Sequence, residues 1–130
     1  MSAQTLMAAI DRLTLAVATA VQELDGIERE LLALEDKTCN GTVYWRASSD
    51  GSAPMMYANH KHDQTCPLHG TPAPGRRLRT YIGKKPYRQD KATTAMELHR
   101  QRTRLLHRQR ALTYALDTTN PINAITARLQ

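Results

Sequence analysis

Two cysteines and a group of histidines are the side chains of this sequence best suited to chemistry. Cys39 stands apart from the others, whereas His60, His62, Cys66 and His69 follow one another within one short segment. Thiolate and neutral imidazole are the usual ligands of tetrahedral structural zinc. We therefore expect a metal site formed by Cys39, His62, Cys66 and His69, with His60 as the alternative to His62.

The strongest local motif is Cys66-Pro67-Leu68-His69-Gly70. It resembles the zinc knuckle Cys-Pro-x-Cys-Gly of zinc ribbons, with an imidazole in place of the second thiolate. Two ligands three residues apart reach one metal only if the backbone turns tightly, which proline and glycine favour. Cys39, however, lacks a second ligand close to it in the sequence. Two reduced, partly buried thiols therefore remain an alternative, as does a disulfide, which a reducing compartment disfavours.

Charge is divided unevenly along the chain. The whole carries +6, but residues 1–36 hold two arginines against seven acids, a net charge of −5. Residues 76–110 hold twelve lysines and arginines against Asp90 and Glu97, a net charge of +10. So dense a positive segment attracts polyanions, and nucleic-acid phosphates are the commonest ones in a cell. The alternative is that these cations pair with the chain's own acids, which are too few to neutralise them all.

We expect a binding surface that joins arginines for phosphate contact with tyrosine rings for base stacking. Alternation along two predicted strands places five such side chains on one face, and a stripe of arginines at i, i+4 and i+8 continues along the C-terminal helix. The predicted nucleic-acid-binding residues are Tyr44, Arg46, Arg76, Arg77, Arg79, Tyr81, Lys84, Lys85, Arg88, Arg100, Arg104 and Arg108.

Catalysis has little support in the sequence. A Cys66–His69 pair would be able to activate a thiolate, but no third residue is evident to orient it. No carboxylate pair, phosphate-binding glycine loop or HExxH motif is present either. We do not expect an enzyme.

Two long helices are predicted to flank these residues. Apolar residues recur at alternating spacings of four and three from Leu6 to Leu34, which is typical of a coiled-coil seam. Ser2 is the expected N-cap, and Gly26 marks a potential kink or close contact. A second helix is expected from about residue 87 or 90 to 117, and a short final helix from residue 121.

Three short strands are predicted between the helices, at residues 42–47, 55–59 and 76–82. A Ser-Ser-Asp-Gly turn joins the first two, and a segment rich in His, Pro and Gly joins the last two. The simplest register buries Trp45, Leu78 and Ile82 against the helices. Three strands need such a surface to be stable.

The expected fold is therefore α+β, with two long antiparallel helices in a coiled-coil-like hairpin flanking a small three-stranded antiparallel module. Residues 1–36 form the first helix, 37–85 the β module and 86–130 the basic helix and terminal segment, all in one compact domain. No basic leader or long unbroken apolar run is present, so we expect a cytoplasmic protein without a membrane partner.

The expected function is that of a DNA- or RNA-binding accessory protein, similar in style to the small basic proteins of phages, plasmids and transposons. It would dimerise, or meet a protein partner, through the first helix or the C-terminal segment. The alternative is a helical adaptor or inhibitor that binds a larger protein, such as an enzyme that acts on nucleic acid.

Overall fold

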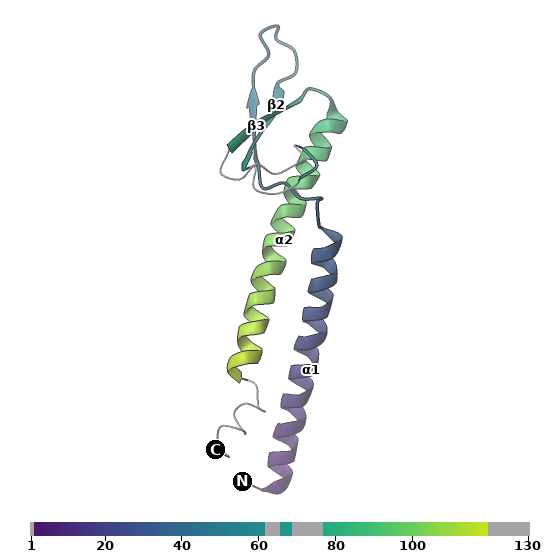
Figure 1. Ribbon diagram of the computed structural model, residues 1–130, viewed down its shortest axis with the longest axis vertical. Helices are drawn as coiled ribbons and strands as arrows, with labels where there is room; N and C mark the ends of the chain where they lie inside the picture. Colours follow the sequence, from purple (N-terminus) through teal and green to yellow (C-terminus); the bar gives the residue numbers. More distant parts are fainter. Residues whose placement is uncertain (1, 62–65, 69–76, 120–130) are drawn as a thin grey trace. The chain divides into compact units, whose positions relative to one another are not determined.

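The described residues form two helices and a three-stranded antiparallel sheet, an α+β arrangement (Figure 1). The computed structural model describes residues 2–61, 66–68 and 77–119. In chain order the elements are α1 (Ala3–Ala33), β1 (Thr42–Arg46), β2 (Met55–Lys61), β3 (Arg77–Gly83) and α2 (Pro86–Thr119). The α+β class predicted from the sequence is confirmed, while coiled-coil packing and stabilisation by zinc remain predictions.

The chain forms two compact units. One, the helical unit, comprises Met1–Leu32 and Leu105–Gln130, and the other, the sheet unit, comprises Ala33–Arg104. The boundary passes through α2, whose first part belongs to the sheet unit and whose last part belongs to the helical unit. The predicted terminal helix, at 121–129, lies outside the described residues.

α1 begins and ends with recognisable capping chemistry. The amide of Thr5 donates to the Ser2 hydroxyl over 3.1 Å, so Ser2 is the predicted N-cap. At the other end Asp36 takes a left-handed φ of 61°, and the amide of Lys37 donates to the Leu34 carbonyl. Gly26 neither breaks the helix nor makes a close contact, because nothing lies within 4 Å of a Cβ placed there. The predicted close contact at Gly26 is therefore not found among the described residues, while the kink remains a prediction.

α2 starts at the earlier of the two positions that the sequence allowed. Pro86 occupies the first turn, where its missing N–H costs no hydrogen bond. The carbonyl of Lys85 accepts from the amides of Arg88 and Gln89. Thr94 and Glu97, which would suit the N-terminus of a helix that starts later, therefore lie in the interior of α2.

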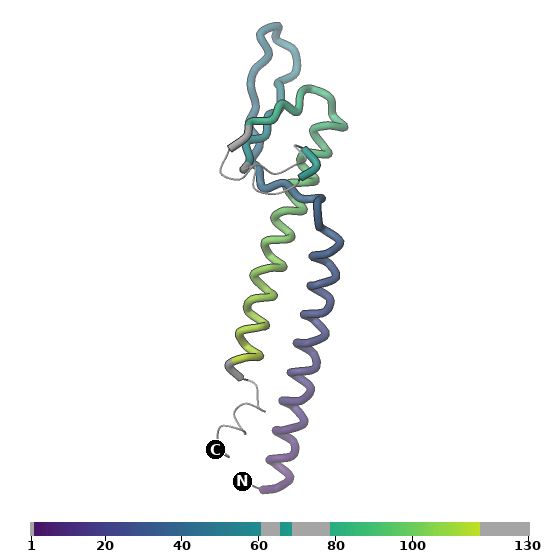
Figure 2. Tube along the Cα trace, viewed as in Figure 1, coloured from purple at the N-terminus to yellow at the C-terminus, as the bar shows by residue number. Residues whose placement is uncertain are grey.

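The sheet has the order β1-β2-β3, and both pairs of strands are antiparallel (Figure 2). Tyr44 lies opposite Tyr57, which in turn lies opposite Tyr81. The ladder between β2 and β3 is irregular there: Met56 pairs with Gly83 and Tyr57 with Tyr81, which leaves Ile82 as the extra residue of a bulge. Gly83 has a φ of 101°, a conformation that side chains rarely allow.

The core of the sheet unit lies between the sheet and the first part of α2. Met56 and Ala58 of β2 and Ile82 of β3 are buried against small and flexible side chains of α2. The helix contributes Ala92, Ala95 and Met96 at spacings of three and one, which places them on one face. Ile82 is buried as predicted.

Trp45 was predicted to be buried, but 52% of its surface is exposed. β1 is an edge strand of only five residues, and Trp45 lies at its penultimate position, so the core side chains cover only part of the indole. The Leu78 side chain, the third predicted core residue, lies outside what the structure describes.

Candidate metal centre and tyrosine face

Cys39, His60 and Cys66 meet in the core of the sheet unit. One potential ligand atom from each residue lies within 4.8 Å of the others, and all three residues are buried. Two thiols and an imidazole at such separations could hold a metal ion. The set contains His60, the alternative ligand in the sequence prediction, while His62 and His69 lie outside the described residues.

Local backbone contacts position Cys39. Its amide donates to the carbonyl of Ala95 in α2 over 2.9 Å, which ties the segment before β1 to the helix. A backbone hydrogen bond from Gly41 also reaches the Cys39 thiol. A Cβ at Gly41 would lie 2.9 Å from the His60 Cβ and 3.2 Å from the Cys39 sulfur. Only glycine fits between the two residues without a shift of one of them.

His60 is held by its neighbour on β3. Its Nε2 lies 2.7 Å from the hydroxyl of Thr80. A histidine that ligates a metal through one nitrogen commonly donates the other N–H to an oxygen acceptor, which fixes its ring. The contact with Thr80 fits this arrangement, in which Nδ1 would be the ligand atom.

Burial, with a smaller contribution from the neighbouring Cys66, raises the pKa of the Cys39 thiol to about 12. Because this pKa lies far above neutral pH, the thiol stays protonated unless a cation is present to stabilise the thiolate. Both cysteines are free thiols, in agreement with the expectation that a disulfide is disfavoured. A protonated thiol is a weak nucleophile, whereas the group could hold a metal ion if a cation stabilised the thiolates.

The opposite side of the sheet carries a row of three tyrosines, one from each strand. The rings of Tyr44 and Tyr57 are stacked with centroids 5.3 Å apart and planes 14° apart. The Tyr57 and Tyr81 rings meet edge to face at 5.2 Å. The guanidinium of Arg79 lies over the Tyr44 ring, 5.4 Å from its centroid. We call these four residues the tyrosine face.

The tyrosine face contains three residues of the predicted surface, Tyr44, Arg79 and Tyr81, and adds Tyr57. Tyr81 and Arg79 are exposed as expected, but Tyr44 is half-buried under its neighbours. The sequence prediction omitted Tyr57. Side chains alternate along β2, so Tyr57 lies on the face opposite to Met56 and Ala58, and this alternation alone would have placed it on the tyrosine face. The side chain of Arg77 and the whole of Arg76 lie outside what the structure describes.

Two predicted arginines of the sheet have no acidic partner in the described ranges. Neither Arg46 nor Arg79 forms an ion pair with any described carboxylate, and both side chains are exposed. By alternation along β1, Arg46 lies on the same side of the sheet as Tyr44. The sheet therefore keeps positive charge beside its aromatic rings.

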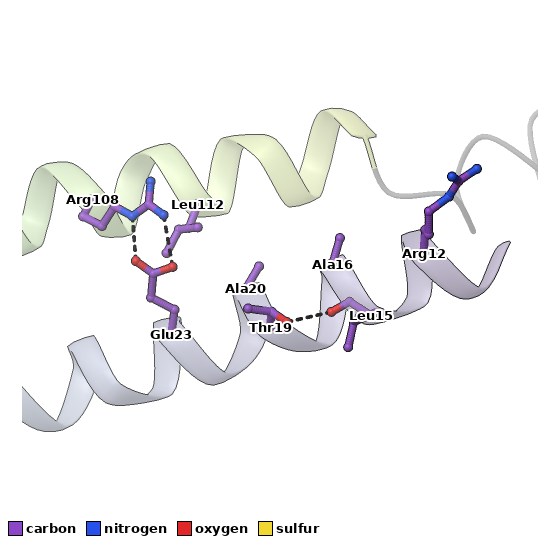
Figure 3. Close-up of a pocket in the computed structure, with 8 residues that line it drawn as sticks. All are labelled: Arg12, Leu15, Ala16, Thr19, Ala20, Glu23, Arg108 and Leu112. Atoms are coloured by element: carbon purple, nitrogen blue, oxygen red, sulfur yellow. Dashed lines mark hydrogen bonds and ion pairs between the residues drawn. The ribbon is translucent and has the colours of Figure 1, made fainter. Parts of the chain in front are cut away.

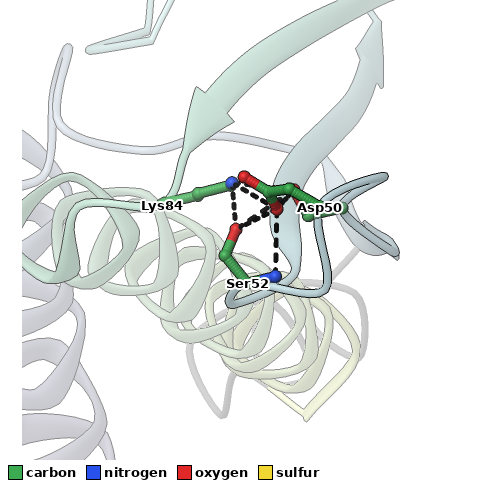
Figure 4. A network of polar contacts seen from close by, with 4 residues as sticks. Asp50, Ser52 and Lys84 are labelled. Atoms are coloured by element: carbon green, nitrogen blue, oxygen red, sulfur yellow. Dashed lines mark hydrogen bonds and ion pairs between the residues drawn. The ribbon is translucent and has the colours of Figure 1, made fainter.

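Lys84 has a structural partner instead of a free ammonium group (Figure 4). It donates to the hydroxyls of Ser48 and Ser52 and lies 3.9 Å from the Asp50 carboxylate. Hydrogen bonds from Ser52 and Ser48 to that carboxylate lower the pKa of Asp50 below its ordinary value, with a smaller contribution from Lys84. Lys84 thus fastens the loop between β1 and β2 to the end of β3, which makes it a poor phosphate contact.

The predicted arginine stripe of α2 is engaged by the chain's own carboxylates. Arg100 and Arg104 both approach Glu97, at 2.7 and 3.7 Å. In the helical unit Arg108 donates twice to Glu23, at 2.7 and 3.0 Å. These pairs are exposed, so each contributes little to stability and can be exchanged for other partners. They nevertheless reduce the positive field of the helix. Lys85 and Arg88, also predicted contacts, are exposed near the start of α2.

The helical unit has a shallow pocket between α1 and the last part of α2 (Figure 3). Its volume is about 450 Å³, and the Glu23–Arg108 ion pair closes one end. The remaining lining is largely small or apolar; the residues are Arg12, Leu15, Ala16, Thr19, Ala20, Glu23, Arg108 and Leu112. None of the groups that line it suggests catalysis.

α1 exposes much of its apolar surface. The predicted seam is buried at Ile27 and Leu34 but about half exposed at Leu6, Ile10 and Leu13. By length and composition α1 would be able to cross a membrane, with a mean hydropathy of 1.2 over its most apolar window, none of it buried. The sequence alone predicts no such helix, because no unbroken apolar run approaches the length needed to span a bilayer. Core helices and N-terminal signal sequences share this composition, so it selects no function by itself.

Comparisons with family models, with curated proteins and with solved structures found no match to this chain. A function must therefore be inferred from the metal-ligating group and the tyrosine face themselves.

Proposed function

We propose that this protein binds single-stranded nucleic acid, DNA or RNA, through the tyrosine face. The supporting observation is the continuous contact of Tyr44, Tyr57 and Tyr81 across three strands, beside arginines without a described acidic partner. Aromatic rings on a sheet are a recurring platform for unstacked bases, and each stacked base contributes about 1–3 kcal/mol. A duplex hides its base faces, so single strands fit this surface better.

The face divides into two parts with different roles. Tyr81 has 56% of its surface exposed, so its ring is open to a base. Tyr44 is covered on one side by Tyr57 and approached by Arg79, which leaves little of its ring for stacking. We therefore assign base stacking to Tyr81 and phosphate contact to Arg79 and Arg46. The predicted contacts on α2 would contribute only through general charge.

A binding assay with short labelled oligonucleotides tests the proposal. We expect single-stranded 12-mers to bind more tightly than the matching duplex, with affinity falling steeply as salt rises. Tyr81→Ala should weaken binding about tenfold, which corresponds to 1.4 kcal/mol and lies within the range for one stacked base. Tyr114→Ala is the matched control, because Tyr114 is also exposed but lies on α2 in the helical unit. Equal effects of the two substitutions, or no binding at low salt, would refute the proposal.

We further propose that the Cys39–His60–Cys66 group holds a structural zinc ion. Zn²⁺ takes mixed thiolate and imidazole ligands and completes a tetrahedron with a fourth. His69, three residues after Cys66 in the sequence, remains the predicted fourth ligand. Native mass spectrometry of the purified chain should find one zinc per chain, lost in Cys66→Ser. Zinc retained by Cys66→Ser would exclude this ligand set.

A second candidate function is that of a helical adaptor, and the exposed apolar side chains of α1 favour it. Leu15 and Leu32 are 68% and 70% exposed, more than expected of leucines in a helix with no partner. Asp11 and Arg12 within the apolar stretch favour a protein partner over a bilayer. Sedimentation of the wild type and of Leu15→Glu separates the outcomes. A concentration-dependent dimer lost in the variant indicates self-association, whereas a monomer in both leaves a different protein as the partner.

A further inference from the structure

We propose that metal occupancy of the Cys39–His60–Cys66 group controls the affinity of the tyrosine face for single-stranded nucleic acid. This inference rests on the proposed function, whose binding surface it places under the control of a metal ion. The coupling follows from the sheet, because the two sites use opposite faces of the same strands.

β2 connects the sites directly. Tyr57 and Asn59 point to the tyrosine face, while Ala58 and His60 alternate with them and point to the core. Ala58 and His60 are both buried. A displacement of His60 therefore moves the backbone that carries Asn59 and, two residues further, Tyr57.

β1 and β3 both pair with β2 near Asn59, at the end of the sheet that carries His60. Asn59 pairs with Thr42 on one side and with Arg79 on the other, and His60 pairs with the residue before Arg79. Cys39 precedes β1 by three residues and is tied to α2 through the Ala95 carbonyl. A metal ion bound to Cys39 and His60 would thus hold the start of β1 against the end of β2.

The contact between Arg79 and Tyr44 is the element of the tyrosine face most sensitive to this restraint. It joins β3 to β1 across the whole of β2, so it requires both strand pairs to keep their register near Asn59. The contact between Tyr57 and Tyr81 lies nearer to Met56 and Ile82, which are packed on α2. Loss of the metal should therefore displace Arg79 from Tyr44 before it disturbs Tyr81.

The residues around the Cys39–His60–Cys66 group are packed too closely for one ligand to move without moving its neighbours. A Cβ at Gly41 would meet the Cβ of His60, the carbonyl oxygen of Asn59 and the Cys39 sulfur. The hydroxyl of Thr80, next to Arg79 in β3, lies against the His60 ring. Movement of a ligand is therefore passed to the strands rather than taken up by a void.

A metal titration of the full chain tests the inference. We expect saturating Zn²⁺ to raise the affinity for a single-stranded 12-mer at least tenfold over the chelated protein. Arg79→Ala should lose most of this increase, because its phosphate contact is the one that the metal positions. Tyr81→Ala should bind more weakly but keep the same fold-increase with Zn²⁺. A zinc effect of equal size in wild type and Arg79→Ala would overturn the proposed route of coupling.

Hydrogen exchange without any oligonucleotide separates failure of the coupling from failure of the proposed function. Zn²⁺ should slow exchange at the amides of Thr42, Asn59 and Arg79 more than at Met55 and Met56. If the chain takes up zinc but these amides do not respond, the coupling is wrong whatever the protein binds. If they respond but no oligonucleotide binds, the proposed function is wrong. Cys66→Ser should abolish the response, and Thr80→Val, which keeps all three ligands, should weaken it if the serine variant does not fold.

Discussion

The sheet unit and the helical unit differ in how completely each buries its apolar side chains. In the sheet unit two strands and α2 enclose a continuous core, into which the metal-ligating residues are built. In the helical unit Ile27 and Leu112 are buried, while large apolar side chains of α1 remain exposed. The difference separates a unit whose core contains a candidate metal site from a unit with exposed apolar side chains, and it motivates the proposals of a metal ion for the first and a partner surface for the second.

Removal of metal should have the largest effect, and it should fall on the sheet unit. Structural zinc contributes about 10–16 kcal/mol of apparent binding energy in small zinc-finger peptides, and that energy stabilises the fold. We expect a chelator to lower the melting temperature of the sheet while the helical signal of α1 persists. Circular dichroism combined with Trp45 fluorescence measures both, since Trp45 lies on β1. Identical melting of the sheet with and without chelator would contradict a structural ion.

Replacement of a methionine by alanine should lower the unfolding free energy much more in the core of the sheet unit than on the exposed side of α1. Met56 is 2% exposed in the sheet unit, whereas Met7 on α1 is 65% exposed. Met56→Ala should cost roughly 2–5 kcal/mol of unfolding free energy, because a cavity remains. Met7→Ala should stay within about 0.5 kcal/mol. Denaturant unfolding compares the two, and a large cost at Met7 would show that α1 is buried in a dimer.

The two units contain glycines whose replacement by alanine should have opposite effects. Gly41→Ala puts a Cβ 2.9 Å from the His60 Cβ, so we expect a loss of roughly 1–3 kcal/mol and weaker metal binding. Gly26→Ala adds a methyl group in open space within α1 and should stabilise by about 1 kcal/mol. Thermal unfolding of both variants checks the signs. Stabilisation by Gly41→Ala would show that the group is looser than its distances indicate.

Acid should produce the smallest effect, through the ion pair in the helical unit. The hydrogen bond from Arg108 lowers the pKa of Glu23 below its ordinary value of 4.5. The stability contributed by Glu23 is therefore present above pH 4.5 and lost as the pH falls through the lowered pKa. Wild type should melt slightly above Glu23→Gln at pH 7, and the difference should disappear in acid. A difference that persists at pH 2 would have another origin.

Local patterns in the sequence predicted the elements well. The periodicity of α1, the Ser2 cap and the strands around Trp45 and Tyr81 all correspond to observed elements. Such features depend on neighbouring residues, so a single sequence contains them. The place of His60 in the group depends instead on its facing inward from β2, and that requires the register with β3.

Properties that depend on tertiary contacts were harder to predict. Trp45 was expected inside, but its position near the end of an edge strand leaves it exposed. Lys84 was expected to meet phosphate, yet it binds the serines of a loop 32 and 36 residues away in sequence. The ion pair of Arg108 spans 85 residues. Charge counts gave the sign of the field correctly but could not say which cations are already engaged.

β2 responds differently to substitution and to deletion. Its side chains alternate between two faces, with Ala58 and His60 toward the core and Tyr57 and Asn59 toward the tyrosine face, so a substitution changes a side chain on one face directly. Deletion of Ala58 would instead turn Asn59 and His60 over relative to Tyr57, because a shift of one residue moves every later side chain of the strand to the other face. Such a chain would have to give up either the inward position of His60 or the outward position of Tyr57, since no register keeps both.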